Sequence, residues 1–189
     1  MKSWQKKSGS MTEDKGIQRQ GPISQSGDGP SLVQSILMLF VFLSVVFGCA
    51  AAGGYITSQS VNTWYVDILK PEITPEAWVF PIVWNVLFFL MGLAGWLVWR
   101  AAGSLNAAGA AMSIFILQLM LNFSWSLVFF GLHALGLAVV ANIVLDAAIA
   151  LTIYLFCGHS RLGAFLLMPY LFWSLFATWL SFAIWRLNP

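Results

Sequence analysis

Four side chains spaced along one predicted helix are the first candidates for chemistry in this sequence, and they are Gln118, Asn122, Trp125 and Phe129. Their spacing of i, i+4, i+7 and i+11 places them on a single helix face. Flat apolar molecules stack on aromatic rings, and amide groups supply the hydrogen bonds that orient such ligands. This face therefore predicts one wall of a pocket for a large, flat and mostly apolar ligand.

Two further stretches carry aromatic side chains at helical spacing. Trp84 and Phe88 stand at i and i+4, and Tyr170, Trp173 and Ala177 stand at i, i+3 and i+7. If these faces converge with the first, the rings form the pocket and the small Ala177 leaves room beside them. Aromatic stripes at helical spacing also occur where helices merely pack, and buried amides also join helices by hydrogen bonds. A ligand pocket and plain helix packing both remain open on spacing alone.

An acidic residue lies in the middle of another apolar stretch. Asp146 follows Asn142 by four residues, so both lie on one helix face. An ionised carboxylate at mid-membrane costs roughly 2.5–3.5 kcal/mol. Asp146 therefore either joins helices as a neutral or hydrogen-bonded acid, or carries protons in coupled transport.

Other chemistry finds little support in the residue types. His133 and His159 stand in short links without a cluster at metal-ligand spacing, so neither a metal site nor a cofactor is predicted. Cys49 and Cys157 lie within apolar runs, which argues against a disulfide framework. The net charge of +2 and the lack of a basic patch argue against nucleic-acid binding. No phosphate-binding glycine loop or Ser/His/Asp arrangement is present.

The composition shows what positions these side chains. Hydrophobic residues make up 59% of the 189 residues and charged residues 8%, against about 25% charged in soluble domains. Five apolar stretches are each longer than the roughly 20 residues that a helix needs to cross a bilayer. They span about residues 32–56, 79–101, 105–129, 134–157 and 162–186. The sequence predicts an all-α membrane protein, a five-transmembrane-helix bundle with an ordered loop after the first helix.

Two segments outside these stretches differ in character. Residues 1–30 are polar and without apolar periodicity, so we expect a disordered tail before a membrane domain of residues 31–189. Residues 57–78 contain two tryptophans, a tyrosine and the prolines Pro71 and Pro75, which restrict the backbone. This loop is expected to fold over the bundle mouth as a lid, and an interfacial aromatic anchor is the alternative.

The basic residues predict an orientation. Five of the nine Lys and Arg residues lie in the tail, and Arg100 and Arg161 lie beside links on the same side. Lys70 and Arg186 fall on the other side, so the N-terminus is expected to be cytoplasmic. The short chain without an organelle signal favours a bacterial cytoplasmic membrane, with an organellar outer membrane as the alternative. Small residues in 48–54 predict close helix contacts, which we expect to form within the chain.

Several motifs in their observed order carry a resemblance to a known family. They read WY-x4-KP at residues 64–71, WVFP-x2-W at 78–84, QL-x-LN-x2-W-x3-FFG at 118–131 and PYL-x-W-x2-FA at 169–177. Together they resemble the translocator-protein family, also called tryptophan-rich sensory proteins (TspO/MBR), and the likeness covers about residues 32–188. The resemblance implies a five-helix bundle, commonly a homodimer, with a ligand pocket under the first loop.

The family resemblance also implies ligands and site residues. Members bind porphyrins such as protoporphyrin IX, and some bind cholesterol or benzodiazepine- and isoquinoline-type drugs. The implied ligand-binding positions, together with Tyr170 from the spacing above, are Tyr65, Trp84, Phe88, Asn122, Trp125, Trp173 and Ala177. In some bacterial members, tryptophans matching Trp84 and Trp173 are linked to light- and oxygen-dependent porphyrin degradation. A porphyrin receptor or carrier is thus the leading hypothesis, with a photo-oxidative enzyme and a proton-coupled transporter using Asp146 as alternatives.

The chain also departs from the family pattern. After Lys70-Pro71 the family often has an aromatic residue and paired prolines, whereas Ile73 and a single Pro75 stand here. A cholesterol-recognition pattern needs a tyrosine between a leucine and a basic residue, but Phe182 stands between Leu180 and Arg186. Sterol binding is therefore less well supported than porphyrin binding.

Overall fold

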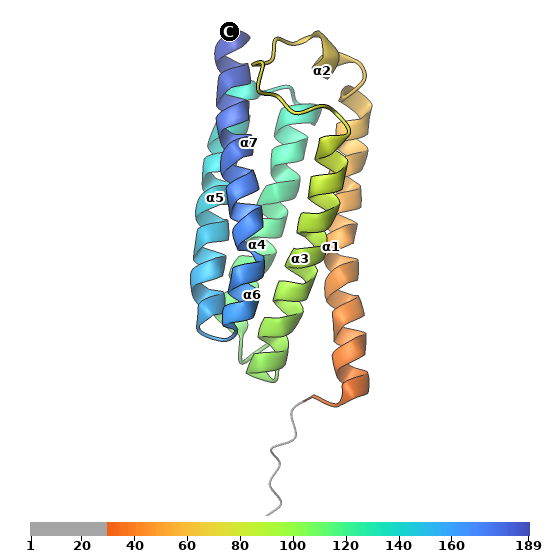
Figure 1. Cartoon of the computed structure of the whole chain (residues 1–189), viewed down its shortest axis with the longest axis vertical. Helices are drawn as coiled ribbons and strands as arrows, with labels where there is room; N and C mark the ends of the chain where they lie inside the picture. The colour runs from red at the N-terminus through yellow and green to blue at the C-terminus, as the bar shows by residue number, and fades with distance from the viewer. Residues whose placement is uncertain (1–29) are drawn as a thin grey trace, which may run out of the picture.

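A computed structural model describes residues 30–189, which form a bundle of long helices lying side by side (Figure 1). The elements are α1 Leu32–Ser60, α2 Trp64–Asp67, α3 Val79–Ala102, α4 Gly109–Ser126, the π-helix η1 Leu127–Gly131, α5 Leu135–Cys157, α6 Arg161–Leu166 and α7 Met168–Leu187. Within residues 30–189, five helices are long and apolar enough to cross a membrane. Two of these helices combine consecutive elements, because η1 continues α4 and α7 continues α6. The predicted five-helix membrane bundle is confirmed. The tail predicted for residues 1–30 lies, apart from Pro30, outside the described residues.

Two helix ends differ from the expected bounds. The first helix continues to Ser60, and the third begins at Gly109 rather than near 105. The later start has a local cause, because Gly103 adopts a left-handed conformation (φ 78°) that ends α3, and Ser104 then accepts a hydrogen bond from the amide of Ala107 (3.1 Å). Pro169 lies in the first turn of α7, directly after the break that separates α7 from α6.

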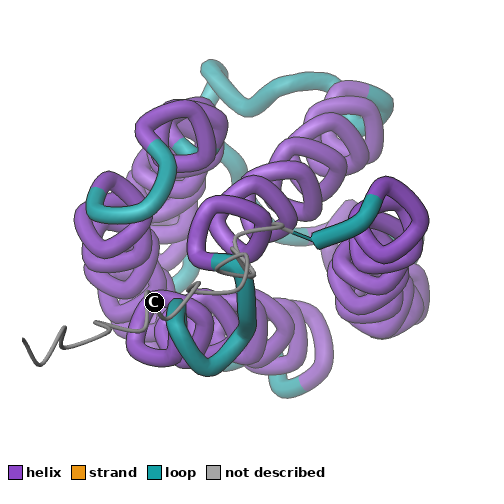
Figure 2. The backbone as a smooth tube through the Cα atoms, turned by 90° about the horizontal axis from the view of Figure 1, so that it is seen from below, coloured by secondary structure: helices purple, strands orange, loops and turns teal. Residues whose placement is uncertain are grey.

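Neighbouring helices pack in a pattern that leaves one side of the bundle loose. α1 packs on α3 and α4, and α5 packs on α4 and α7. α3 packs closely on α6 near the break, while the main partner of α7 is α5. The view along the bundle shows the helices side by side (Figure 2). α3 therefore packs on the last crossing chiefly through α6, at the end remote from the loop.

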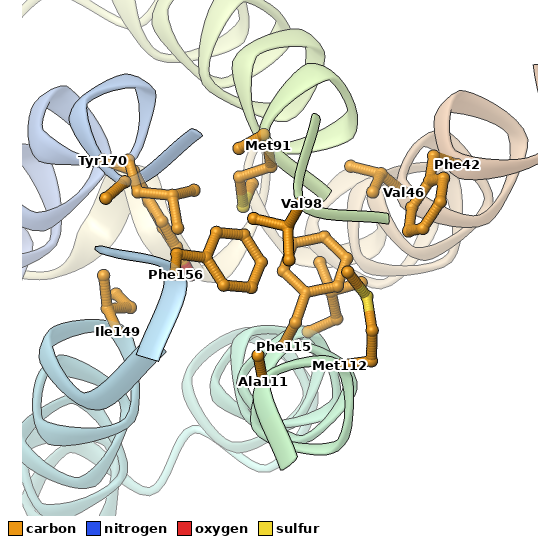
Figure 3. Close-up of a cluster of buried hydrophobic side chains, with 14 of the residues drawn as sticks. Phe42, Val46, Met91, Val98, Ala111, Met112, Phe115, Ile149, Phe156 and Tyr170 are labelled. Atoms are coloured by element: carbon orange, nitrogen blue, oxygen red, sulfur yellow. The ribbon is translucent and has the colours of Figure 1, made fainter. Parts of the chain in front are cut away.

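The main hydrophobic core fills that remote half. Phe115 of α4 and Phe156 of α5 face each other there with ring centroids 5.6 Å apart (Figure 3). Met91 and Tyr170, both fully buried, belong to the same cluster. A second, smaller cluster around Phe129 lies beneath the loop. The two clusters leave space between them for a cavity, in the half of the bundle near the loop.

Small residues set the approach of α1 to α3, although not all of those expected. A Cβ built on Gly92 would lie 2.6 Å from the Leu43 side chain, and one built on Gly95 would lie 2.8 Å from Phe42. Gly48 and Gly54 have open space around their Cβ positions, so the expectation that they pack within the chain is wrong. Within the 48–54 stretch, Ala50 does pack against the main core, and Gly53 makes close contact with Ser126 of α4.

Candidate ligand-binding cavity

A cavity of about 610 Å³ lies in the loop half of the bundle, between α1, α3, α4 with η1, and α7. Its volume falls within the range of about 300–1,000 Å³ typical of small-molecule sites. Aromatic rings dominate its wall, and they come from Phe47, Tyr65, Phe80, Trp84, Phe88, Trp125, Phe129, Phe130 and Trp173. Several of the lining residues on α1 and α3 are themselves exposed.

Pairs of rings hold the wall in a fixed shape. Trp84 stacks on Phe88 with ring centroids 5.5 Å apart, and Trp125 stacks on Phe129 at 5.4 Å, each pair with an interplanar angle of 30°. Each pair lies on one helix, as the i, i+4 spacing requires. Trp173 meets Phe80 edge-on at 5.9 Å, which joins α7 to the start of α3. The cavity thus offers preformed flat surfaces on which a planar ligand can stack.

The structure brings together seven of the eight residues predicted to bind a ligand. Those that line the cavity are Tyr65, Trp84, Phe88, Asn122, Trp125, Trp173 and Ala177. Tyr170 is not on the wall, because its ring is fully buried in the main core. Its hydroxyl instead accepts a 3.1 Å hydrogen bond from the side-chain amide of Asn122. Tyr170 therefore positions a lining residue from behind the wall.

Some lining residues could not be identified from α-helical spacing. Phe130 lines the cavity beside Phe129, although in a regular α-helix consecutive side chains point about 100° apart. The π-helix η1 explains this, with the amide of Leu132 donating to the carbonyl of Leu127 at 2.9 Å. Such local π-turns are common at functional sites. Asn85 of α3 and Ser181 of α7 also line the cavity and add polar groups that the spacing did not single out.

The loop covers the cavity as the lid expected from the sequence. In α2, Trp64 stacks on His133 with centroids 4.0 Å apart, and Tyr65 meets Phe129 and Phe130 edge-on. Ser60 donates a 2.7 Å hydrogen bond to the Phe130 carbonyl and lies 3.1 Å from Nε2 of His133. One end of the lid is thereby fixed to the link between η1 and α5.

The other end of the lid is held by the C-terminal end of α7. The side chain of Asn188 accepts from the amide of Leu69 (3.0 Å) and donates to its carbonyl (2.9 Å). Lys70 donates to the carbonyl of Ile68 (2.9 Å), with its ammonium 4.8 Å from the centre of the Tyr65 ring. Burial raises the pKa of the Tyr65 phenol above its ordinary value. The lid is thus held by specific contacts from Ser60 to Lys70.

The electrostatic character of the cavity is neutral and weakly polar. Among residues 30–189, its lining contains no Asp, Glu, Lys or Arg. Its polar groups there are the indoles, the Tyr65 phenol, and the amides, hydroxyls and thiol of Asn62, Asn85, Asn122, Cys49, Thr57, Ser58, Ser126 and Ser181. The indole N–H groups of Trp125 and Trp173 have no hydrogen-bond partner among the described residues. Within residues 30–189, no group of three His, Cys, Asp or Glu side chains is placed to hold a metal ion. The arrangement suits the binding of an apolar aromatic molecule.

Comparison with known proteins gives this cavity a family context. Residues 40–186 match the model of the TspO/MBR family. The chain belongs to the TspO/MBR family. It is 42% identical to the tryptophan-rich protein TspO of Archaeoglobus fulgidus over 154 residues, which cover 82% of this chain and 99% of that protein.

More distant relatives support the same assignment. The translocator protein of Homo sapiens is 33% identical over 147 residues, covering 77% of this chain and 86% of its own length. The tryptophan-rich sensory protein of Cereibacter sphaeroides is 34% identical over 148 residues, 78% of this chain and 91% of its own. TspO/MBR membership and five apolar helices identify an integral membrane protein of the sensory and translocator type.

Proposed function

We propose that the cavity binds porphyrins of the protoporphyrin IX type, and other flat apolar molecules, and that the protein is a receptor or carrier in tetrapyrrole sensing, transport or disposal. The single observation that supports this best is the pair of stacked aromatic surfaces, Trp84–Phe88 and Trp125–Phe129, on the wall of one neutral cavity. A planar macrocycle gains stacking on both surfaces, and the Asn122 amide offers a hydrogen bond.

The binding proposal is tested by titrating protoporphyrin IX into the purified protein in the dark while tryptophan fluorescence is recorded. We expect saturable 1:1 quenching, and a Trp84→Phe variant should lose part of it. Trp179→Phe is the matched control, because Trp179 of α7 is not part of the cavity lining and its side chain is 47% exposed. Equal quenching in the two variants, or no saturation in the parent, would rule out this cavity as the porphyrin site.

A second candidate function is light- and oxygen-dependent porphyrin degradation. It is favoured by the placement of Trp84 and Trp173, which line the same cavity from α3 and α7 and both lie near aromatic partners. A porphyrin excited by light would touch two electron-rich indoles, with molecular oxygen as the oxidant. Illumination should then bleach the porphyrin in the parent and spare it in the Trp84→Phe/Trp173→Phe double variant. If bound porphyrin survives illumination in both the parent and the double variant, degradation is excluded and the receptor or carrier function stands.

A proton-coupled transporter using Asp146 has less support. Asp146, the residue on which it depends, lies between α5 and α7 and is not part of the cavity lining. A transport pathway through the cavity would not pass its carboxyl group directly.

We also propose that the N-terminus is cytoplasmic and that the membrane is a bacterial cytoplasmic membrane. In the bundle, Arg100 and Arg161 lie at the end opposite the lid, while Lys70 and Arg186 lie at the lid end (Figure 1). Together with the five basic residues of the tail this satisfies the positive-inside rule. Cysteine labelling of intact cells tests it: Ser104→Cys should be protected from an impermeant reagent and Gln59→Cys labelled, and the reverse pattern would invert the orientation.

A homodimer is proposed from one outward face of α1. Gly48 has open space around its Cβ position, and Ala52, one turn later, is exposed. Small residues four apart let two helices approach closely in lipid. Gly48→Leu should shift the protein toward monomer in cross-linking experiments, whereas an unchanged dimer would exclude this face.

A further inference from the structure

Asn85 is a polar residue of the membrane-spanning helix α3, and it is both exposed and part of the cavity lining. It lies about 9 Å along the helix axis from Val79, the first residue of α3. The 24 residues of α3 extend over about 36 Å, against roughly 30 Å for the hydrocarbon core of a bilayer. A helix of this length centred on the core places the Asn85 amide inside the hydrocarbon layer, where a polar group without a partner is costly.

One hydrogen bond fixes the orientation of this amide. Nδ2 of Asn85 donates to the carbonyl oxygen of Pro81, one turn earlier in α3, at 2.8 Å. A carbonyl oxygen can only accept, so the atom that faces Pro81 is the amide nitrogen. Oδ1 is therefore directed away from Pro81. No described residue forms a hydrogen bond with Oδ1 or with the second N–H of Nδ2.

The facing surface of α1 leaves the Asn85 amide uncovered. A Cβ built on Gly92 would lie 2.6 Å from the Leu43 side chain, which fixes the register of the antiparallel helices α1 and α3. Asn85 lies about two turns before Gly92, so Ala50, about two turns after Leu43, is at the same level. The cavity lining near this level of α1 consists of small residues, Ala50, Ala51 and Gly54. The amide is thus accessible to a molecule in the cavity.

Other polar groups of the lining differ from Asn85 in their surroundings. Thr57 donates to the carbonyl of Gly53 at 3.0 Å, and Asn122 donates to a buried hydroxyl in the core. Asn62 also makes no side-chain hydrogen bond within residues 30–189, but it follows the end of α1 and lies outside the membrane-spanning segments. Water can satisfy the Asn62 amide, whereas the Asn85 amide needs a partner within the membrane.

Asn85 also lies beside one of the stacked aromatic surfaces of the cavity. It directly follows Trp84 and precedes Phe88 by three residues, and positions i and i+3 share a helix face. Trp84 and Phe88 stack on each other with ring centroids 5.5 Å apart. A flat molecule that lies on these rings therefore brings one of its edges to the Asn85 amide.

The two free groups of this amide define the chemistry that it can recognise. Oδ1 accepts and the remaining N–H donates, and a carboxamide or a protonated carboxylic acid presents the matching donor and acceptor side by side. An ionised carboxylate fits less well, because it cannot donate to Oδ1 and the described cavity lining contains no Lys or Arg. A purely apolar edge would leave both groups of the amide without a partner.

We propose that Asn85 is a specificity-determining residue of the cavity, which selects flat apolar ligands with a neutral carboxamide or carboxylic acid group at one edge. The ligand group donates to Oδ1 and accepts from Nδ2, while its ring system stacks on Trp84 and Phe88. This inference rests on the proposed binding of flat ligands in the cavity, although it does not require the ligand to be a porphyrin.

The experiment compares two neutral derivatives of protoporphyrin IX, the bis-carboxamide and the dimethyl ester, of which only the carboxamide has edge N–H groups to donate. Each is titrated in the dark into the full-length protein in lipid vesicles while tryptophan fluorescence is recorded. Asn85→Leu should weaken carboxamide binding about tenfold more than ester binding, a size typical of one strong hydrogen bond. Comparing parent and variant for each probe cancels differences in partition into lipid, and retained ester binding shows that the variant is folded.

Asn62→Leu is the matched control, because it removes the same amide from the lining outside the hydrocarbon layer. It should change the affinities for the two probes equally or not at all. Asn85→Gln keeps an amide and should retain part of the preference for the carboxamide. Equal effects of Asn85→Leu on both probes, or a selective loss in Asn62→Leu alone, would overturn the inference.

A second pair of probes separates this inference from the proposed function. Pyrene carboxamide and the methyl ester of pyrene carboxylic acid carry the same two groups on a smaller flat ring system. If the porphyrin derivatives do not bind but the pyrene pair shows the selective loss in Asn85→Leu, the role of Asn85 stands and the porphyrin assignment is wrong. If the porphyrin derivatives bind without a selective loss, the proposed function stands and the role of Asn85 is wrong. If neither pair binds in a saturable manner, both are wrong.

Discussion

The side-chain amide of Asn122 on α4 donates a 3.1 Å hydrogen bond to the hydroxyl of Tyr170 on α7. Asn122 faces the cavity, whereas Tyr170 lies entirely in the core below it. The pair therefore joins two helices that lie on different sides of the cavity and fixes the orientation of its innermost amide. Trp84 meets the same tyrosine ring edge-on at 6.2 Å, so one buried residue supports both a polar and an aromatic part of the wall.

Replacing Tyr170 by phenylalanine should therefore weaken both stability and binding. The variant leaves the buried Asn122 amide without its acceptor, which costs about 1–3 kcal/mol. We expect a lower unfolding temperature in detergent and weaker porphyrin binding, because Asn122 is then free to turn. Tyr154→Phe is the control, since Tyr154 is 74% exposed and makes no side-chain hydrogen bond to the described chain. If the two variants bound porphyrin equally, the hydrogen bond would have no role in shaping the cavity.

Close packing of α1 on α3 makes a second prediction. A methyl group on Gly92 would overlap the Leu43 side chain at 2.6 Å, and one on Gly95 would overlap the Phe42 ring at 2.8 Å. Gly95→Ala should destabilise the protein by about 1–3 kcal/mol through overpacking. Gly54→Ala should be neutral or stabilising by roughly 0.5–1 kcal/mol, because no described residue lies within 4 Å of its Cβ position. Thermal unfolding of the two variants compares them, and equal stabilities would contradict the observed helix approach.

The bundle and most of the cavity wall were accessible from the sequence for a physical reason. In a membrane helix, polar and aromatic residues at helical spacing rarely face lipid, so the stripes through Asn122 and Trp84 could be assigned to an inward face. Spacing gives direction around a helix but not depth within the bundle. Tyr170 shares a face with Trp173, yet it lies one level deeper and is covered by the core.

Other features depend on contacts that no local pattern reveals. The π-helix adds Phe130 to the wall because one turn widens, and nothing in the residue types around Leu127–Gly131 identifies that widening. The pairing of Asn188 with Leu69 joins residues 119 positions apart. The positions of small residues also did not predict which face of α1 packs against another helix. Gly53 and Gly54 are neighbours in the chain, yet only Gly53 packs against another described helix.

The lid should respond to alkaline pH through Tyr65. Burial disfavours its phenolate and raises the pKa of the phenol in the folded protein above that in the unfolded chain. Above the ordinary pKa of about 10, the unfolded state binds fewer protons than the folded state, so stability must fall as pH rises. Melting temperatures between pH 8 and about 11 should therefore decline less steeply in Tyr65→Phe than in the parent. Lys70 is retained in both proteins, so parallel curves would assign the decline to other groups.

The contact between Asn188 and Leu69 should hold the lid closed. Asn188 satisfies both the amide and the carbonyl of Leu69, in the way that a neighbouring strand would. Asn188→Ala removes both hydrogen bonds, each with a net contribution of about 1 kcal/mol, and local opening should become about thirtyfold more frequent. Hydrogen exchange of the Leu69 amide measures this opening, and porphyrin should dissociate faster as well. Asn106→Ala at the opposite end of the bundle is the control, because the Asn106 side chain makes no hydrogen bond within residues 30–189. Unchanged exchange at Leu69 in Asn188→Ala would show that the aromatic contacts of Trp64 and Tyr65 hold the lid without this pair.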